Sequence, residues 1–246
     1  MMHADATGNT FLMVDQSVPK SQRVDWIKQQ QVSEDGVIWV DPAEEGFTID
    51  YYNRDGSNAA LCGNGTRSSL CYLLRLGLIR ANEWVALFTG SGKLQGLALS
   101  AEEAMVAMPN PCMIASVRWQ ENQGVAVMVG VPHVVFQAES KEAWKRWDLQ
   151  KAFQEMSRLS VLPQGANINC CYFEQGVLFN RTFERGVEAE TLSCGTGCVA
   201  AVWAMKEILS HGLLPTKVQT QGGMLEVFIK QQNYYLKGKV ILNELV

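Results

Sequence analysis

Two cysteines that are each followed by Gly-x-Gly occur far apart in the sequence: Cys62 in LCGNG (61–65) and Cys194 in SCGTG (193–197). Each directly precedes a segment with the apolar periodicity of a helix, so we expect each sulfur to lie among the N–H groups of a helix start. These N–H groups and the helix dipole stabilise a thiolate and attract a carboxylate. The glycines allow a ligand to approach the backbone closely. Each motif therefore predicts a carboxylate site beside a reactive sulfur.

The two cysteine motifs belong to a longer internal repeat. In both copies a glycine-led apolar segment follows the predicted helix, starting at Gly92 in one copy and at Gly223 in the other. Several features in one order at nearly one spacing indicate two copies of a mostly-β unit with a central helix. Two such units facing one ligand would place a sulfur on either side of the carbon next to its carboxylate. This suits inversion at that carbon, because one cysteine as thiolate removes the α-proton and the other as thiol supplies a proton to the opposite face.

The elements that must position these cysteines are mainly strands. Short apolar segments bounded by Gly, Asn, Asp or Pro recur along the chain and predict strands. Helical periodicity is limited to four segments, at about 21–31, 66–76, 140–159 and 196–210. The second and fourth are apolar on nearly every face, so each must be buried. The sequence therefore predicts an α/β (α+β) chain of two pseudo-symmetric halves, each a β-sheath or barrel around a central helix.

We place the boundary between the two halves in the proline-containing stretch at 109–111. The first half then comprises residues 1–110 and carries Cys62, and the second comprises residues 111–246 and carries Cys194. The last predicted strand is also compatible with a return to the first half. With 246 residues and 47% hydrophobic content, the chain is long enough to form a sizeable packed core.

Composition and charge argue against several classes of function. The net charge of −4 is spread without a run of lysines or arginines, so neither nucleic acid nor a membrane is an expected partner. No apolar stretch is long enough to span a membrane, and the start of the sequence lacks the features of an export signal. We therefore expect a cytoplasmic protein, in which seven cysteines, an odd number, indicate reduced thiols.

The sequence gives little support for a metal or an organic cofactor. Cys194 and Cys198 have C-x₃-C spacing, but no second ligand pair has a matching spacing and the chain has only three histidines. TGSGKLQG (89–96) resembles part of a phosphate loop but lacks the upstream glycine and the Ser or Thr after Lys93. No lysine lies in a recognisable cofactor motif. We therefore expect chemistry without metal or cofactor, and a Schiff-base lysine stays open as an alternative.

Six sequence segments occur in a fixed order along the chain: TGNTF, NRDGSNAALCGNGTR, VPHVVF, GANIN, ERGVEAETLSCGTGCVAA and GGMLEV. Together they resemble the diaminopimelate epimerase family over essentially the whole chain. The resemblance implies two pseudo-symmetric α/β halves, and epimerisation of L,L-diaminopimelate to the meso form in lysine and peptidoglycan precursor biosynthesis. It also implies a homodimer that acts on a small-molecule amino acid and uses no cofactor or metal.

The resemblance also implies roles for individual residues. Cys62 and Cys194 match the catalytic pair, and His133 and Glu184 match groups that tune the two sulfurs. The positions that match substrate contacts are Asn9, Asn53, Gly63, Asn64, Asn167, Glu184, Arg185, Gly195 and Thr196.

Ordinary structural roles are the alternatives for these residues. A histidine such as His133 is commonly a hydrogen-bonded structural residue, Glu184 and Arg185 could form a surface ion pair, and an asparagine such as Asn53 could form a turn. For the other cysteines we expect a core-filling role; they are Cys71, Cys112, Cys170, Cys171 and Cys198.

The chain departs from the family pattern at three places that bear on the substrate. Val131 stands where the family usually has asparagine, and Gly36 stands where some members have glutamine. The segment ERGVEAET is one residue longer than the usual turn. These departures leave open a related cofactor-independent racemase for another amino acid. A proton-shifting isomerase or a small-acid binding protein on the same scaffold is a further alternative.

Overall fold

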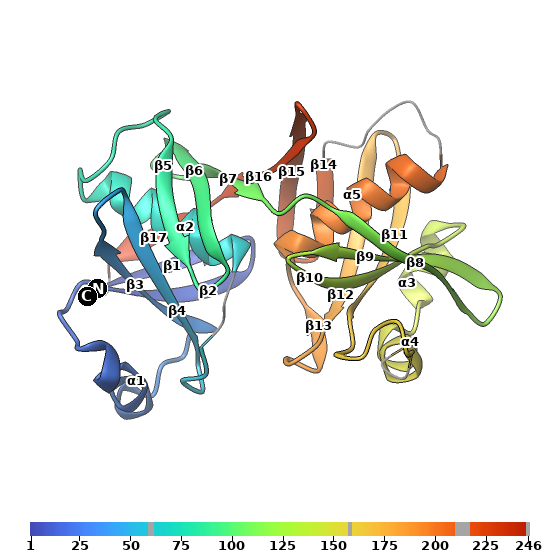
Figure 1. Cartoon of the computed structure of the whole chain (residues 1–246), viewed down its shortest axis with the longest axis horizontal. Coiled ribbons are helices and arrows are strands. Elements are labelled where there is room, and N and C mark those ends of the chain that lie inside the picture. The colour runs from blue at the N-terminus through green and yellow to red at the C-terminus, as the bar shows by residue number, and fades with distance from the viewer. Residues whose placement is uncertain (59–61, 157–158, 210–216, 245–246) are drawn as a thin grey trace. The chain divides into compact units, whose positions relative to one another are not determined.

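The computed structural model describes residues 1–58, 62–156, 159–209 and 217–244. These residues form a mixed α+β structure dominated by strands (Figure 1). The chain divides into two compact units: unit 1 comprises Met1–Ala107 with Lys237–Val246, and unit 2 comprises Met108–Leu236. Within the described ranges, no helix is long and apolar enough to cross a membrane.

In unit 1, paired strands surround one helix. The elements are β1 (Met2–Ala6), β2 (Asn9–Val14), η1 (Lys20–Gln22), α1 (Arg23–Gln30), β3 (Gly36–Pro42), β4 (Phe47–Asn53), α2 (Gly63–Arg75), β5 (Val85–Thr89), β6 (Gly92–Ser100), β7 (Glu103–Met108) and β17 (Ile241–Glu244). Neighbouring strands pair in the order β17, β1, β2, β3, β4, β5, β6, β7. Helix α2 packs against strands on several sides, namely β1, β2, β3, β4, β6 and β17 (Figure 1).

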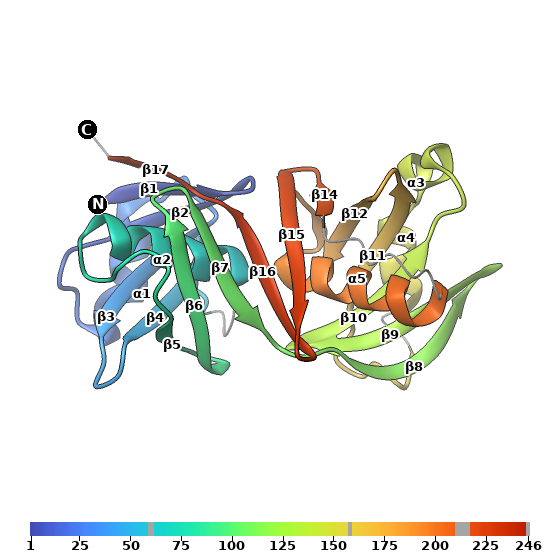
Figure 2. The same ribbon diagram turned by 90° about the horizontal axis from the view of Figure 1, so that it is seen from above.

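In unit 2, a similar set of strands surrounds a second helix. The elements are β8 (Cys112–Trp119), β9 (Asn122–Val129), β10 (Val131–Gln137), α3 (Lys141–Arg146), α4 (Leu149–Met156), β11 (Asn167–Glu174), β12 (Val177–Glu184), β13 (Ala189–Thr191), α5 (Gly195–Leu209), β14 (Lys217–Thr220), β15 (Gly223–Lys230) and β16 (Asn233–Lys239), which ends in unit 1. Strands pair in the order β8, β9, β10, β11, β12, β14, β15, and β13 also pairs with β12. Helix α5 packs against β9, β10, β11, β12 and β15 (Figure 2).

The two units share one pattern of strand directions. From β1 to β6, successive pairs are antiparallel, parallel, antiparallel, parallel and antiparallel. The series β9, β10, β11, β12, β14, β15 repeats this pattern. The enclosed helix enters at the same point of each series, because α2 lies between β4 and β5 and α5 lies between β12 and β14. This arrangement confirms the predicted fold class, two pseudo-symmetric halves that each enclose a central helix.

Helix α2 starts and ends where the sequence signals predict. Cys62 caps it in an extended conformation (φ −136°), and its side chain accepts a hydrogen bond from the N–H of Gly65. The helix ends in a Schellman arrangement, in which Leu78 N donates to Leu73 O and the N–H of Gly77 (φ +70°) bonds one turn back. Every residue of α2 from Gly63 to Leu73 is buried. Strands therefore hold the backbone beside Cys62 in place along most of the helix.

Each unit has a second apolar layer on the outer side of its strands. In unit 1, Val37 and Trp39 of β3 belong to a cluster that includes Ile27 of α1, whereas Ile38 lies close to Gly65 of α2. Strand β3 is therefore buried on both faces, which explains its continuous apolar run. In unit 2, side chains of α3 and α4 pack against the strands in a corresponding outer cluster.

The prediction of one helix at 140–159 is wrong, because two helices, α3 and α4, occupy this segment. Trp147 adopts an extended conformation (ψ 125°) and ends α3, and its ring packs against Trp119 and Phe136. Asp148 then caps α4 by accepting from the N–H of Lys151 at 2.9 Å. The sequence analysis also missed strands β1, β8, β13 and β14, of which β1, β13 and β14 are short and lack an apolar run.

Candidate active site

The sulfur of Cys62 lies in a polar network at the start of α2. The N–H of Gly65 donates to this sulfur at 3.3 Å, and the thiol donates to Asn9 Oδ1 at 3.7 Å. Asn64 Nδ2 donates to the same oxygen at 3.3 Å. The structure therefore brings together four residues that the sequence analysis singled out in unit 1, namely Asn9, Cys62, Gly63 and Asn64.

Two charged side chains that the sequence analysis did not name hold this network. Asp35 Oδ2 accepts from Asn9 Nδ2 at 3.2 Å and from the backbone N–H of Thr10 at 2.9 Å. The buried guanidinium of Arg67 donates to Asn64 Oδ1 at 2.7 Å. A carboxylate accepts and a guanidinium donates, so these two groups determine which end of each asparagine amide faces Cys62. The thiol consequently meets the oxygen of Asn9.

Asn53 is the last residue of β4, and its side chain is hydrogen-bonded within β4 and to the turn that follows. Its Nδ2 donates to Ser57 Oγ at 2.9 Å, and its Oδ1 accepts from the hydroxyl of Tyr51 at 3.0 Å. These contacts are those of a turn-forming asparagine, the alternative considered for it. Gly36 is close to the same tyrosine, since a Cβ at this position would clash with the ring of Tyr51 and lie 2.8 Å from the carbonyl oxygen of Tyr52. A larger residue at position 36 would therefore require this ring to move.

The equivalent sulfur in unit 2 belongs to Cys194, which directly precedes α5. Its carbonyl accepts the first helical hydrogen bond, from Cys198 N at 2.9 Å. The N–H of Gly197 bonds to the sulfur, as the N–H of Gly65 does to Cys62. The hydroxyl of Thr196 lies 3.5 Å from the sulfur. Both cysteines thus directly precede a helix, as the sequence predicts.

The thiolate character expected for Cys194 from its helix start is not observed. Burial raises the pKa of this thiol well above its usual value, and the nearby Glu184 raises it further. The hydrogen bonds from Thr196 and Gly197 lower the pKa by less. Desolvation of the buried sulfur thus opposes the effect of the helix-start N–H groups and exceeds it. Cys194 is therefore a thiol that requires a base to become a nucleophile or proton acceptor.

Glu184, at the end of β12, is the carboxylate beside Cys194. Burial raises the pKa of Glu184, whereas hydrogen bonds with Thr191 and Cys194 lower it by less. The Thr191 hydroxyl donates to Glu184 Oε1 at 2.5 Å, so β13 holds this carboxylate in position. A carboxyl group with a raised pKa beside a buried thiol is suited to take the thiol proton.

His133, Asn167 and Glu184 occupy one row across three neighbouring strands. His133 of β10 pairs with Asn167 of β11, and the register of β11 with β12 places Asn167 opposite Glu184. Asn167 Oδ1 accepts from the backbone N–H of Arg185 at 3.0 Å, which fixes the turn after β12. His133 is fully buried, and this burial, with a contribution from the charge of Arg185, lowers its pKa to about 3. The imidazole is therefore neutral at physiological pH.

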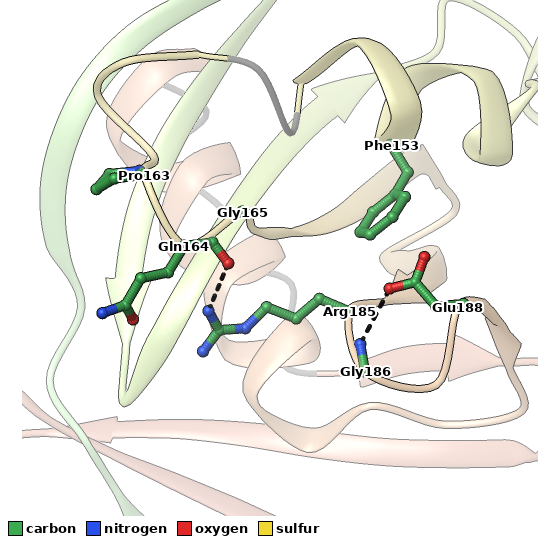
Figure 3. Close-up of a pocket in the computed structure, with 7 residues that line it drawn as sticks. All are labelled: Phe153, Pro163, Gln164, Gly165, Arg185, Gly186 and Glu188. Carbon is green, nitrogen blue, oxygen red and sulfur yellow. Dashed lines mark hydrogen bonds between the residues drawn. The ribbon is translucent and has the colours of Figure 1, made fainter.

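Arg185 lines a pocket of about 610 Å³ in unit 2 (Figure 3). Its guanidinium donates to the carbonyl oxygen of Gln164 at 3.0 Å. Glu188 lies on the same turn and accepts from the N–H of Gly186 at 3.3 Å. The other residues that line the pocket are Phe153, Pro163 and Gly165. The pocket thus offers a cation and an anion beside the turn that carries Glu184.

The remaining predicted positions lie where the motifs place them. Gly195 and Thr196 are the first residues of α5, and Val131 is the first residue of β10. Among the described residues, no group of three or more His, Cys, Asp or Glu side chains is arranged to hold a metal ion.

Several polar residues around the two cysteines escaped the sequence analysis. They are Asp35, Arg67 and Thr191, together with Asn169 of β11 and Thr182 of β12, which are hydrogen-bonded to each other. A usable signal existed for two of them. Arg67 is a charged residue in a helix that the sequence predicts to be buried, and Asn169 alternates with Asn167 within a mostly apolar strand. Charged or amide side chains at such positions need partners, so they indicate a buried network.

Comparison with known proteins identifies close sequence similarity to one enzyme family. The sequence profile described as diaminopimelate epimerase matches residues 125–242. The diaminopimelate epimerase of Thermotoga maritima is 33% identical over 240 residues, which cover 96% of each chain. That of Archaeoglobus fulgidus is 28% identical over 263 residues, covering 96% of this chain and 91% of the relative.

A solved structure supports the assignment of the fold. A phenazine biosynthesis protein of the PhzF family from Bacillus anthracis superposes with a TM-score of 0.77. The match covers 99% of this chain and 96% of that protein at 16% sequence identity. At this identity the likeness shows a shared fold only.

Proposed function

Because this chain belongs to the diaminopimelate epimerase family and is an isomerase, we propose that it converts L,L-diaminopimelate to the meso form in lysine and peptidoglycan precursor biosynthesis. The observation that carries the proposal is the duplicated helix start. In each unit a cysteine precedes the enclosed helix, and the N–H three residues later bonds to its sulfur. Beside each sulfur lies an oxygen acceptor, from Asn9 in unit 1 and from Glu184 in unit 2.

The helix starts supply the proposed carboxylate site. The N–H groups of Gly65 and Gly197 bond to the two sulfurs. The N–H groups of the preceding residues, Gly63 with Asn64 and Gly195 with Thr196, lie in the first turn of each helix, where backbone N–H groups commonly bind anions. We assign these groups to the reacting carboxylate. They would also stabilise the negative charge that grows on its oxygens as the α-proton leaves.

The two sulfurs carry the proposed proton transfers. Glu184 takes the proton of the Cys194 thiol, and the resulting thiolate removes the α-proton of the substrate. The Cys62 thiol then gives its proton to the opposite face of the same carbon. Roles exchange in the reverse direction, so that Cys62 removes the proton and Cys194 returns one. The proposal requires both sulfurs to reach one carbon, on opposite faces.

The pocket beside Arg185 supports a substrate with a second polar end. Diaminopimelate carries an amino acid group at each end, and Arg185 and Glu188 offer opposite charges to such a group. A racemase for a different amino acid is the second candidate. It is favoured by Val131, which offers no polar side chain where the family usually has asparagine, and by the longer turn at 184–191.

Exchange of the α-proton in D₂O tests the proposal. The protein is incubated with L,L-diaminopimelate, meso-diaminopimelate and a panel of other amino acids, and deuterium incorporation is followed by NMR. We expect exchange and epimerisation with diaminopimelate well above the rest of the panel. Cys62→Ala and Cys194→Ala should each abolish turnover, while Cys112→Ala, which removes an exposed thiol, serves as the matched control. Faster exchange with another amino acid of the panel would favour the second candidate, and activity in both active-site variants would rule out the two-cysteine scheme.

A further inference from the structure

A buried polar network lies beneath the start of α5 in unit 2. Asn169 Nδ2 is 3.1 Å from His133 Nδ1 and donates to the carbonyl oxygen of Val134 at 3.2 Å. Asn169 Oδ1 accepts from the hydroxyl of Thr182 at 2.8 Å. His133 and Asn169 are fully buried and Thr182 nearly so. Water therefore has no access to these groups, and the protein alone determines how they are hydrogen-bonded.

The contacts determine which end of the Asn169 amide faces the imidazole. The carbonyl oxygen of Val134 only accepts, so the group that faces it must be the NH₂ of Asn169. The Thr182 hydroxyl donates to the opposite end of the same amide, which is consistent with an oxygen there. His133 Nδ1 therefore also faces the NH₂ group. A ring nitrogen that faces a donor must accept, so Nδ1 carries no proton.

From this arrangement we infer that Asn169 is a positioning residue, which holds His133 in the tautomer with its proton on Nε2. Nothing in the sequence motifs assigns a role to Asn169. The Nε2 atom of His133 is itself buried and has no hydrogen-bond partner among the described residues. The network thus leaves a buried N–H donor, whose acceptor must come from outside these contacts.

The consequence for the reaction rests on the proposed function. His133 shares a row with Asn167 and Glu184, so it lies on the strand face that carries the base for Cys194. With its proton on Nε2, His133 is a hydrogen-bond donor at that atom and has no lone pair there. It does not take a proton from a thiol through Nε2. Glu184 is then the proton-accepting group of this row.

Nitrogen-15 NMR of the imidazole tests the tautomer without any substrate. The chain has three histidines, so His3→Gln and His211→Gln variants leave one imidazole and assign its signals to His133. At pH 7 we expect Nδ1 to resonate as an unprotonated ring nitrogen and Nε2 as a protonated one. A protonated Nδ1 would overturn the inference, whether it came from the other tautomer or from an imidazolium.

Two variants separate the role of Asn169 from general damage to the network. Asn169→Leu removes the donor, so Nδ1 and Nε2 should both show the averaged signals of exchanging tautomers. Thr182→Val breaks the same network but leaves Asn169 bonded to the carbonyl of Val134, so the wild-type pattern should persist. An unchanged pattern in Asn169→Leu would overturn the inference. If that variant does not fold, the wild-type and Thr182→Val spectra still decide the tautomer.

Addition of meso-diaminopimelate distinguishes this inference from the proposed function. Nδ1 of His133 should stay unprotonated when this ligand is bound. If NMR shows the expected tautomer but the protein exchanges no α-proton of diaminopimelate, the proposed reaction is wrong and the role of Asn169 stands. If the protein exchanges the α-proton but Nδ1 is protonated, the proposed reaction stands and the inferred role of Asn169 is wrong.

Discussion

The side-chain oxygen of Asn9 lies 3.7 Å from the sulfur of Cys62. Asp35 and Arg67 set this contact, because the carboxylate accepts from the NH₂ of Asn9 and the guanidinium donates to the oxygen of Asn64. The two asparagine amides then meet with Asn64 Nδ2 donating to Asn9 Oδ1 at 3.3 Å. The oxygen offered to Cys62 favours a thiol at this position over a thiolate, since a thiolate cannot donate to it.

Replacement of Asp35 should impair turnover by releasing Asn9. In Asp35→Asn the new amide can present NH₂ as well as oxygen, so the Asn9 amide is free to rotate and present its NH₂ to Cys62. We expect kcat/KM for diaminopimelate to fall by about 10- to 100-fold. The pH profile should also move, because an NH₂ donor beside the sulfur favours a thiolate over a thiol.

Asp15→Asn is the matched control for this experiment. Asp15 is an exposed carboxylate that pairs with the N-terminal amino group. The same chemical change there should leave both kcat/KM and the pH profile unchanged. A loss of rate in Asp35→Asn without a shift in the profile would indicate a structural role only.

Removal of the Thr191 hydroxyl should move the acidic limb of the activity profile to higher pH. In the proposed reaction Glu184 must be ionised to accept the thiol proton, and burial already raises its pKa. The hydroxyl of Thr191 stabilises the ionised form, so Thr191→Val raises the pKa of Glu184 further. The rate should therefore fall at a higher pH than in the wild type when the solution is acidified.

The matched control removes a hydroxyl elsewhere. Thr89→Val lies in the hairpin between β5 and β6, where the hydroxyl donates to the carbonyl of Gly92. Its profile of kcat/KM against pH should superpose on that of the wild type. If the pH profile of Thr191→Val also superposed on that of the wild type, Glu184 would not be the group that titrates in the acidic limb.

The sequence predicted those features that depend on residues close together along the chain. The apolar helices behind Cys62 and Cys194 and the end of α2 at Gly77 follow from residues that are neighbours along the chain. The break at Trp147 was not predictable in this way, because its ring is held by aromatic residues of β8 and β10 that lie distant in sequence.

The contacts around the two sulfurs were also only partly predictable, because several of them join residues that are distant in sequence. The family motifs identify Asn9, Asn64 and Glu184. They do not show that Asp35, which precedes β3, bonds to Asn9, or that Thr191 of β13 bonds to Glu184. Such contacts depend on strand register, which the sequence alone leaves undetermined.

Stability should depend on pH through His133. Burial lowers the pKa of this group to about 3 in the folded protein, whereas an unfolded chain has a pKa of about 6.5. Between these values the unfolded state binds more protons, so stability rises with pH and falls on acidification. His133 alone should therefore cost about 2 kcal/mol of unfolding free energy between pH 7 and pH 5.

Urea unfolding of the wild type and His133→Asn at these two pH values measures this effect. The variant removes the titrating group, so its loss of stability on acidification should be smaller by that amount. All other groups contribute to both proteins and cancel in the comparison. Equal losses in the two proteins would show that His133 is not held neutral.

The helix starts of the two units should respond differently to an added methyl group. A Cβ at Gly197 would lie 2.5 Å from Asn169 Oδ1 and 2.9 Å from Thr182 Oγ1, atoms fixed in the buried network. Gly197→Ala should therefore cost about 1–3 kcal/mol of unfolding free energy. At the equivalent Gly65 the nearest atom is the terminal methyl of Ile38 at 3.0 Å, which can rotate away. Gly65→Ala, measured by the same urea titration, should cost less.

A double-mutant cycle identifies the cause of the difference between these two glycines. Asn169→Ala removes the atom closest to the added methyl group at position 197, so the double variant should be more stable than the sum of the two single effects predicts. The measured coupling would then place the backbone of the second helix start directly against the amide that orients His133. Additive effects would mean that α5 shifts away from the network, and the contact between Gly197 and Asn169 would not constrain the helix.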